Sequence, residues 1–206
     1  MPLLTWRFNL AFQLAAGLHH EQTRKRSSVP YISHLMAVCS LVLDAGGDED
    51  QAIAALLHDA VEDQDGLSTL ATIRHLFGNR VANAVEACSD STVSDPKEKP
   101  PWRERKESYL AHLQDGNADS LIVGAADKLH NARAILSDYR QIGDRIWEKF
   151  SVPKQQQLWY YRALAEAFSN TAAPKLLVNE LVRVVKELSE SCEWARATSR
   201  LNQQHG

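Results

Sequence analysis

A short ionisable cluster in the first third of the chain has the residue types and spacing of a catalytic site. An apolar run that ends at Leu57 is followed by His58-Asp59 and, two residues later, by Glu62-Asp63. In a continuous helix, Glu62 lies one turn above His58 and Asp63 one turn above Asp59. Carboxylates this close repel one another unless a cation or a proton offsets their charge. Mixed imidazole and carboxylate donors suit a divalent ion of the manganese or iron type. The alternative interpretation of this segment is a solvated helix end with ordinary acidic residues.

Two distant residues are candidates to complete such a metal site. His34 lies in a segment that is apolar on most of its surface, where a single histidine is more often a structural core residue. Asp127 follows the apolar run Leu121–Ala126, and Asn131 lies four residues later on the same helical face. Because an unpaired buried carboxylate is costly, a metal or another cation is the expected partner of Asp127. The predicted ligands are His34, His58, Asp59 and Asp127, with open positions left for water and substrate.

Two basic segments are candidates for binding an anionic substrate. Arg24-Lys25-Arg26 on its own is typical of a solvated turn, but beside an anion-binding site its arginine and lysine could hold a charged ligand. The segment Ser89–Lys106 contains five lysines and arginines together with Trp102. It is either a lid over distal phosphates or, as the simpler interpretation, a charged connector.

The elements that must position these residues are all predicted to be helical. Apolar residues recur at helical spacing, prolines and glycines separate the segments, and no pair of convincing alternating strands is present. The sequence therefore predicts an all-α bundle of roughly eight to ten helices in a single domain over residues 1–206. The predicted helices are Trp6–His20, Pro30 to about Leu43, Asp48 to about Asp63, Ser68–Phe77, Val81–Cys88, Arg103–Leu113, Ala118–Tyr139, Pro153–Ser169 and Lys175–Cys192.

The composition is that of an ordinary globular domain and disfavours several classes of protein. The 206 residues are 44% hydrophobic and 24% charged, with a formal net charge of -3. A protein that coats nucleic-acid backbones usually has a basic excess, so no nucleic-acid partner is expected. Three well-separated cysteines cannot form a disulfide framework or a CxxC metal knuckle, which favours a reducing cytoplasm. We expect no membrane span or signal peptide, because the longest apolar stretch, Leu35–Leu43, is short and the N-terminus lacks a basic segment.

These motifs together resemble the HD-domain metal-dependent phosphohydrolases. The similarity is greatest to the hydrolase half of the RelA/SpoT alarmone enzymes and to stand-alone small alarmone hydrolases. It rests on three segments in the same order, over about residues 10–136, and the helices at about 153–192 lie outside it. The segments are Lys25-Arg26-Ser27 before Pro30-Tyr31-Ile32-Ser33-His34, then Leu57-His58-Asp59-Ala60-Val61-Glu62-Asp63, then Ala126-Asp127-Lys128-Leu129-His130-Asn131.

The resemblance implies a role for each matching position. His34, His58, Asp59 and Asp127 would bind one manganese ion, and Glu62 and Asp63 would orient and deprotonate the attacking water. The resemblance assigns nucleotide binding to Asn131, to Arg24, Lys25 and Arg26, and to a tyrosine that we expect to be Tyr160. Two departures concern the substrate: the basic pair reads Lys25-Arg26 instead of Arg-Lys, and Ala134 replaces a threonine near the base.

The expected function is hydrolysis of the 3′-pyrophosphate of a purine alarmone of the ppGpp or ppApp type, with release of pyrophosphate. Alternatives are a phosphatase that acts on another phosphorylated nucleotide such as NADPH, and a non-catalytic nucleotide-binding module. The expected partner is the small nucleotide, with self-association left open, and synthesis of the alarmone is not expected.

Overall fold

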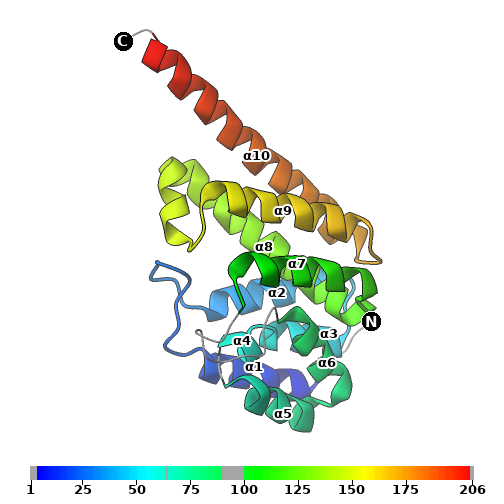
Figure 1. The fold of residues 1–206 in the computed structure, drawn as a ribbon. Helices are drawn as coiled ribbons and strands as arrows, with labels where there is room; N and C mark the ends of the chain where they lie inside the picture. The colour runs from blue at the N-terminus through cyan, green and yellow to red at the C-terminus, as the bar shows by residue number, and fades with distance from the viewer. Residues whose placement is uncertain (1–3, 64, 90–99, 205–206) are drawn as a thin grey trace.

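The computed structural model is built from helices, as the sequence predicts (Figure 1). It describes the backbone of residues 4–63, 65–89 and 100–204, and the side chains of these except 63 and 194–204. Within this part of the chain, the only β-structure is an isolated bridge between Thr23 and Pro30. The elements are α1 (Trp6–Leu18), α2 (Ile32–Asp44), α3 (Glu49–Leu57), α4 (Ala60–Asp63), α5 (Gly66–Phe77), α6 (Asn79–Cys88), α7 (Trp102–His112), the 3-10 helix η1 (Leu113–Asp115), α8 (Ala118–Ile142), the 3-10 helix η2 (Gly143–Lys149), α9 (Lys154–Ser169) and α10 (Lys175–Gln204).

Three helices, α2, α3 and α8, pack against one another and form the centre of the fold. Helix α3 begins with a capping box, in which the Asp48 side chain accepts from the Gln51 backbone and the Gln51 side chain accepts from the Asp48 backbone. Its residues Ala52–Leu57 are all buried. Helix α8 is capped by Asn117, whose side chain accepts from the Ser120 amide at 2.9 Å. Local capping and continuous burial together hold these helices in place.

The link between α2 and α3 depends on a glycine that allows close approach. A Cβ atom on Gly47 would lie 2.5 Å from Cγ1 of Val42 and 2.8 Å from its carbonyl oxygen. The Gly47 amide instead donates to that carbonyl at 2.9 Å. This tight turn returns the chain from α2 directly into α3 and brings the start of one helix near the end of the other.

Several predicted boundaries differ from the structure, and the largest difference is at α10, which is predicted to end at Cys192 but continues to Gln204. The predicted helix that runs through Asp63 is wrong, because α3 ends at Leu57 and α4 begins only at Ala60. The preceding helix begins at Ile32 instead of Pro30, which forms the bridge to Thr23. The predicted connector also extends too far, since α7 starts at Trp102 and contains the arginines and the lysine up to Lys106. Lys97 and Lys99 lie outside the described residues.

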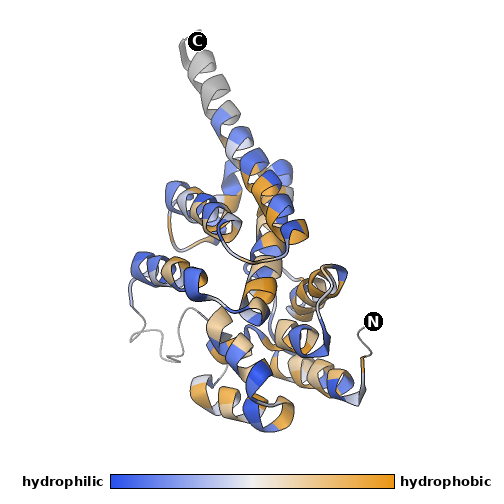
Figure 2. Ribbon diagram, turned by 90° about the vertical axis from the view of Figure 1, so that its right-hand side faces the viewer, coloured by the Kyte–Doolittle hydropathy of each residue, from blue (hydrophilic) through white to orange (hydrophobic). Residues whose placement is uncertain are grey.

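The C-terminal helices form a second layer on α8. Helix α10 packs along α8 and α9, and its C-terminal part extends beyond the other helices (Figure 1). Apolar residues of α9 and α10, such as Leu164 and Leu181, are buried, while charged residues such as Arg162 and Arg183 are exposed, and Figure 2 shows hydrophobic and hydrophilic residues interspersed along the helices. In the described part of the chain, no helix combines the length and the apolar character needed to cross a membrane.

Candidate functional site

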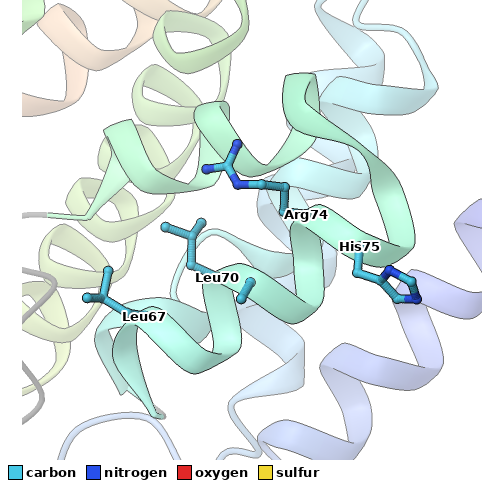
Figure 3. A pocket seen from close by; sticks show the side chains of 5 residues that line it. Leu67, Leu70, Arg74 and His75 are labelled. Carbon is cyan, nitrogen blue, oxygen red and sulfur yellow. The ribbon is translucent and has the colours of Figure 1, made fainter.

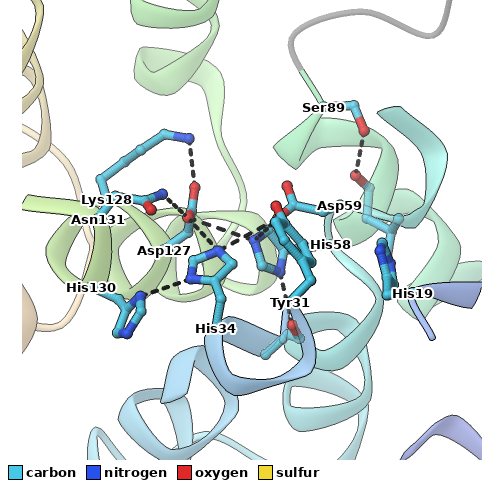
Figure 4. Close-up of polar contacts among 12 residues, drawn as sticks. His19, Tyr31, His34, His58, Asp59, Ser89, Asp127, Lys128, His130 and Asn131 are labelled. Atoms are coloured by element: carbon cyan, nitrogen blue, oxygen red, sulfur yellow. Dashed lines mark hydrogen bonds and ion pairs between the residues drawn. The ribbon is translucent and has the colours of Figure 1, made fainter. Parts of the chain in front are cut away.

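The four predicted ligands meet in one cluster, in which Asp59 is half-buried and the other three are buried, although they come from three different segments (Figure 4). His34 lies in the first turn of α2, His58 and Asp59 lie between α3 and α4, and Asp127 lies in the middle of α8. His34 Nε2 is 3.4 Å from Asp59 Oδ2 and 3.2 Å from Asp127 Oδ1. His58 Nε2 is 3.1 Å and 3.6 Å from the same two atoms. Two imidazole nitrogens thus face two carboxylate oxygens at distances of 3.1–3.6 Å.

The orientation of both imidazoles suits metal binding. The Nδ1 atom of His58 lies 2.8 Å from the Ala55 carbonyl oxygen, and because a carbonyl can only accept, Nδ1 carries the hydrogen. The Nδ1 atom of His34 lies 2.7 Å from Nδ1 of His130. Neither Nε2 atom has a hydrogen-bond partner, although both histidines are at least 98% buried. A pair of buried, unpartnered imidazole nitrogens beside two carboxylates fits a divalent ion of the kind that N and O ligands bind.

Neighbouring side chains hold the two carboxylates in place. The Tyr31 hydroxyl donates to Asp59 Oδ2 at 2.6 Å. Lys128 Nζ donates to Asp127 Oδ2 at 2.6 Å, and Asn131 Nδ2 donates to Asp127 Oδ1 at 2.5 Å. The position of Asn131 one turn after Asp127 on α8 explains this last contact. Each candidate carboxylate is therefore oriented before any ligand arrives.

The charges of the cluster are strongly coupled. Burial by itself raises the pKa of Asp127, but the Lys128 ammonium and the two imidazoles outweigh it and hold that pKa well below its ordinary value. Burial also raises the pKa of Asp59, yet the His58 charge and contacts with both imidazoles lower it well below normal. Burial lowers the pKa of His58, and the two carboxylates reverse this and raise it well above normal. The cluster thus attracts a positive charge, which a proton or a metal ion can supply.

The predicted catalytic carboxylates lie on α4, next to this cluster in the chain. Glu62 is half-buried on α4, and Asp63 is the last residue of that helix. The Asp63 side chain lies outside the described residues. Because α3 ends at Leu57 and α4 begins at Ala60, Glu62 and His58 do not share the one continuous helix that the sequence predicts. The role of Glu62 and Asp63 in handling the water stays a prediction.

A cavity of about 720 Å³ opens beside the cluster, and its lining includes Tyr31, His130 and Asn131, each of which contacts a residue of the cluster. This volume is within the usual range for small-molecule sites. Its lining carries four basic side chains and a single acidic one, Asp138, which is paired with Lys149 at 2.9 Å. The basic residues are Arg24, Lys25, Lys106 and Lys149. The cavity therefore suits an anionic ligand with an apolar part, because Ile135, Ile146 and Phe150 also line it.

The predicted basic turn divides between the cavity and the protein surface. Arg24 Nη2 donates to Asn131 Oδ1 at 2.6 Å, and Lys25 lies over the Phe150 ring at 5.6 Å. Both residues line the cavity. Arg26 does not line it, and its guanidinium donates to the Glu148 carbonyl instead. Arg24 and Lys25 are therefore the residues of this turn that can reach a bound ligand.

Of the two adjacent tyrosines on α9, Tyr161 lines the cavity, whereas Tyr160, the predicted residue, does not. Tyr160 is 95% buried and packs against the rings of Trp102 and Trp159. The neighbouring Tyr161 lines the cavity together with Ala134. Successive residues of a helix point about 100° apart, so a shift of one residue separates a packing position from a cavity position.

A second hollow lies away from this cluster, on the surface of α5 (Figure 3). It is lined by Leu67, Leu70, Ala71, Arg74 and His75. The Arg74 guanidinium already donates a hydrogen bond to Asn83 Oδ1 at 2.8 Å. The lining of the hollow contains no carboxylate. Among its described lining residues only Arg74 and His75 carry ionisable side chains, so it holds no cluster of carboxylates and imidazoles like that of the first site.

Sequence reasoning missed three residues of the site, Tyr31, Lys128 and His130. All three lie within the motifs described above. The partners of Tyr31 and His130 are distant in the chain, and the ion pair of Lys128 with the adjacent Asp127 was not predicted. Tyr31 reaches Asp59 on another segment, and His130 reaches His34 across 96 residues. Burial and the neighbouring His34 and Arg24 lower the pKa of His130 to about 4. The one local signal was the adjacency of Lys128 to a buried aspartate, which a paired charge would be expected to stabilise.

Comparisons with known proteins agree with this geometry. Residues 11–153 match the family model described as the HD domain. A Synechocystis protein named "Probable guanosine-3′,5′-bis(diphosphate) 3′-pyrophosphohydrolase" is 39% identical over 128 residues, which cover 61% of this chain and 16% of that protein. The bifunctional (p)ppGpp synthase/hydrolase SpoT of Escherichia coli is 32% identical over 63% of this chain and 18% of its own length. The guanosine-3′,5′-bis(diphosphate) 3′-pyrophosphohydrolase of Mus musculus is 36% identical over 60% of this chain and 66% of its own length. The chain thus spans only a small part of the long bacterial relatives and just under two thirds of the mouse protein.

Solved structures show the same fold. One, described as a metazoan ortholog of SpoT that hydrolyses ppGpp, superposes with a TM-score of 0.69 at 23% identity, covering 89% of this chain and 97% of that one. A protein from Listeria monocytogenes superposes with a TM-score of 0.66 at 28% identity, covering 75% and 97%. The family match over residues 11–153, together with the buried histidine and aspartate cluster, shows that the chain belongs to the HD-domain family.

Proposed function

We propose that the chain is a metal-dependent hydrolase that removes the 3′-pyrophosphate of a purine alarmone of the ppGpp or ppApp type. The observation that carries the proposal is the pair of buried, unpartnered Nε2 atoms of His34 and His58 facing two carboxylates beside a basic cavity of nucleotide size. The names of the relatives supply the substrate class, because the Escherichia coli and mouse proteins are both named for (p)ppGpp or its 3′-pyrophosphohydrolysis.

We further propose that His34, His58, Asp59 and Asp127 hold one manganese ion. The mixed nitrogen and oxygen donor set supports an ion of this type over one that prefers thiolates. Such an ion, when bound, lowers the pKa of water toward about 7 and so supplies hydroxide at neutral pH. Tyr31, Lys128 and Asn131 keep the two carboxylates in their ligating orientation.

The cavity residues bind the nucleotide in this proposal. Arg24 and Lys25 attract phosphate charge or stack on the base, and Lys106 and Lys149 add positive charge from α7 and η2. Asn131 contacts both Arg24 and Asp127, so it links the nucleotide to the ligand cluster. Apolar residues such as Ile146 and Phe150 are suited to the base or the ribose.

The reaction requires one water and one leaving group. A water oxygen attacks the phosphorus attached to the ribose 3′-oxygen, the bond between that phosphorus and the 3′-oxygen breaks, and the 3′-oxygen takes a proton. Glu62 and Asp63 are proposed to orient the water and accept its proton. The products are pyrophosphate and a nucleotide with a free 3′-hydroxyl.

The test is an assay of the purified chain with MnCl2 and either ppGpp or ppApp. Pyrophosphate should appear with both the metal and the nucleotide present, and excess EDTA should abolish its release. Asp59→Asn should be inactive while retaining the circular-dichroism spectrum of the unmodified chain. Turnover that persists in EDTA or in Asp59→Asn would contradict the metal-dependent mechanism.

A second candidate is a phosphatase that acts on a different phosphorylated nucleotide such as NADPH, and one observation favours an adenine nucleotide of either kind over a guanine nucleotide. Ala134 lies on the cavity wall and has no side-chain hydrogen-bonding group with which to select a guanine. The products separate the two functions, since the alarmone hydrolase releases pyrophosphate and the phosphatase releases orthophosphate. A non-catalytic nucleotide-binding module would bind nucleotide without releasing either product.

We also propose a reducing, cytoplasmic location. Cys39, Cys88 and Cys192 are all free thiols in the structure, as expected for a chain that does not rely on disulfides.

A further inference from the structure

His130 occupies a position between a candidate metal ligand and the nucleotide cavity. It lies on α8, three residues after Asp127, and is half-buried. Its Nδ1 atom is 2.7 Å from Nδ1 of His34, while the residue also lines the cavity (Figure 4). One ring therefore touches both halves of the site.

The short distance between the two Nδ1 atoms determines where the hydrogens lie. Two ring nitrogens at hydrogen-bond distance share a single hydrogen, so one of them donates and the other accepts. His34 can bind a metal through Nε2 only if that atom keeps its lone pair, and a neutral His34 then carries its hydrogen on Nδ1. His34 Nδ1 donates, His130 Nδ1 accepts, and the hydrogen of His130 lies on its own Nε2.

This arrangement differs from that of His58. His58 Nδ1 donates to the Ala55 carbonyl, a backbone group that can only accept and has no second function. His34 instead donates to a side chain whose opposite nitrogen is a hydrogen-bond donor. The structure records no partner for His130 Nε2 among the described residues, whereas Arg24, Lys25 and Asn131 line the same cavity.

We propose that His130 is a positioning residue with two separate roles. This inference rests on the proposed function. Through Nδ1, His130 holds His34 in the tautomer and orientation that leave Nε2 able to bind a metal. Through Nε2–H it donates a hydrogen bond to a phosphate oxygen of the nucleotide in the cavity. Partners of ligating histidines typically change metal affinity 10–100-fold when they are lost.

Two amide variants separate these roles, because each amide reproduces one ring nitrogen. In His130→Asn, the amide oxygen takes the place of Nδ1 and can still accept from His34, but the Nε2 donor is gone. In His130→Gln, the amide nitrogen takes the place of Nε2, but the acceptor for His34 is gone. His130→Phe removes both, and His75→Gln, at an exposed position on α5, is the matched control for histidine replacement.

The first readout is Mn²⁺ binding without nucleotide, measured from the electron paramagnetic resonance signal of free Mn²⁺. His130→Asn should bind Mn²⁺ within about threefold of the unmodified chain, and His130→Gln and His130→Phe should bind it at least 10-fold more weakly. The second readout is binding of ppGpp to the chain in EDTA, measured by calorimetry. There His130→Gln should resemble the unmodified chain, while His130→Asn and His130→Phe should bind about 10-fold more weakly.

The outcomes distinguish this inference from the proposed function. If the unmodified chain binds Mn²⁺ and ppGpp but the Asn and Gln variants lose both equally, the division of roles is wrong. If all His130 variants match His75→Gln in both measurements, His130 has neither role. If the unmodified chain binds no Mn²⁺, the proposed function fails and this inference fails with it.

Discussion

The buried ion pair between Asp127 and Lys128 allows a quantitative prediction of the free energy of unfolding. Their charged atoms are 2.6 Å apart, and the side chains are only 7% and 15% exposed. A double-mutant cycle tests this pair. It compares the free energy of unfolding of the unmodified chain with those of Asp127→Asn, Lys128→Met and the double variant, all in EDTA so that no metal contributes. Both replacements are close in size to the residues that they remove.

The magnitude follows from what each variant leaves behind. Removing one partner of a buried pair costs about 3–5 kcal/mol, because the other charge stays buried. We expect about 3 kcal/mol for Asp127→Asn, since the more exposed Lys128 can turn partly toward water. Lys128→Met should cost about 2 kcal/mol, because Asp127 retains the Asn131 amide and the two imidazoles. Replacing both partners leaves no unpaired charge, so the double variant should cost about 2 kcal/mol and the coupling energy should be about 3 kcal/mol.

The assay is urea unfolding followed by circular dichroism, with the free energy of unfolding extrapolated to water. Comparable slopes for all four proteins would show that the same transition is measured. Should the two single effects add to the double effect within about 0.5 kcal/mol, Lys128 does not stabilise Asp127 and the electrostatic account of the cluster is wrong.

Three further predictions concern the metal, the cavity and the outer layer. Mn²⁺ at about 100 times its Kd should add about 2.7 kcal/mol to the stability of the folded chain, which raises the Tm by about 5–10 °C in differential scanning fluorimetry; Asp59→Asn should show no such shift. Tyr161→Phe should raise the KM for the nucleotide about threefold or more if its hydroxyl contacts the ligand, whereas Tyr160→Phe should leave the KM unchanged, and equal KM values for both would refute the assignment. Hydrogen bonds from Arg183 lower the pKa of Glu180 from 4.5 to about 2, so this carboxylate stabilises the folded chain above pH 4.5 and loses that effect as the pH falls toward 2. The stability difference between the unmodified chain and Glu180→Gln, from urea unfolding at pH 6 and at pH 3, should therefore shrink at the lower pH.

Much of the fold and most of the candidate ligand residues could be predicted from local patterns. Apolar periodicity located the start of each long helix within a few residues, because a helix buries one stripe of its own sequence, but it placed the end of α10 at Cys192 instead of Gln204. Buried runs that end in His58-Asp59 and in Asp127 indicated functional side chains, since burying an uncompensated charge is costly. His34 was less distinct, because a histidine in an apolar helix is equally well explained by the core.

The predictions of Tyr160 as the cavity tyrosine and of a continuous helix through His58 do not match the structure, because neighbouring residues there do not differ in hydrophobic pattern. Trp159, Tyr160 and Tyr161 are all aromatic, so periodicity alone does not determine which ring faces the cavity. The run from Leu57 to Val61 continues the helical pattern, yet the chain breaks the helix at His58 and Asp59. These choices depend on packing against other segments.

The sequence by itself determined which helices form and which residues are candidates for the chemistry, because both depend on residue types at short spacing. Only the tertiary structure decided how those residues act together. The contacts of Tyr31 with Asp59, of His130 with His34 and of Arg24 with Asn131 join segments 28, 96 and 107 residues apart. The register and direction of packed helices set such contacts, and neither is written in any one segment of the chain.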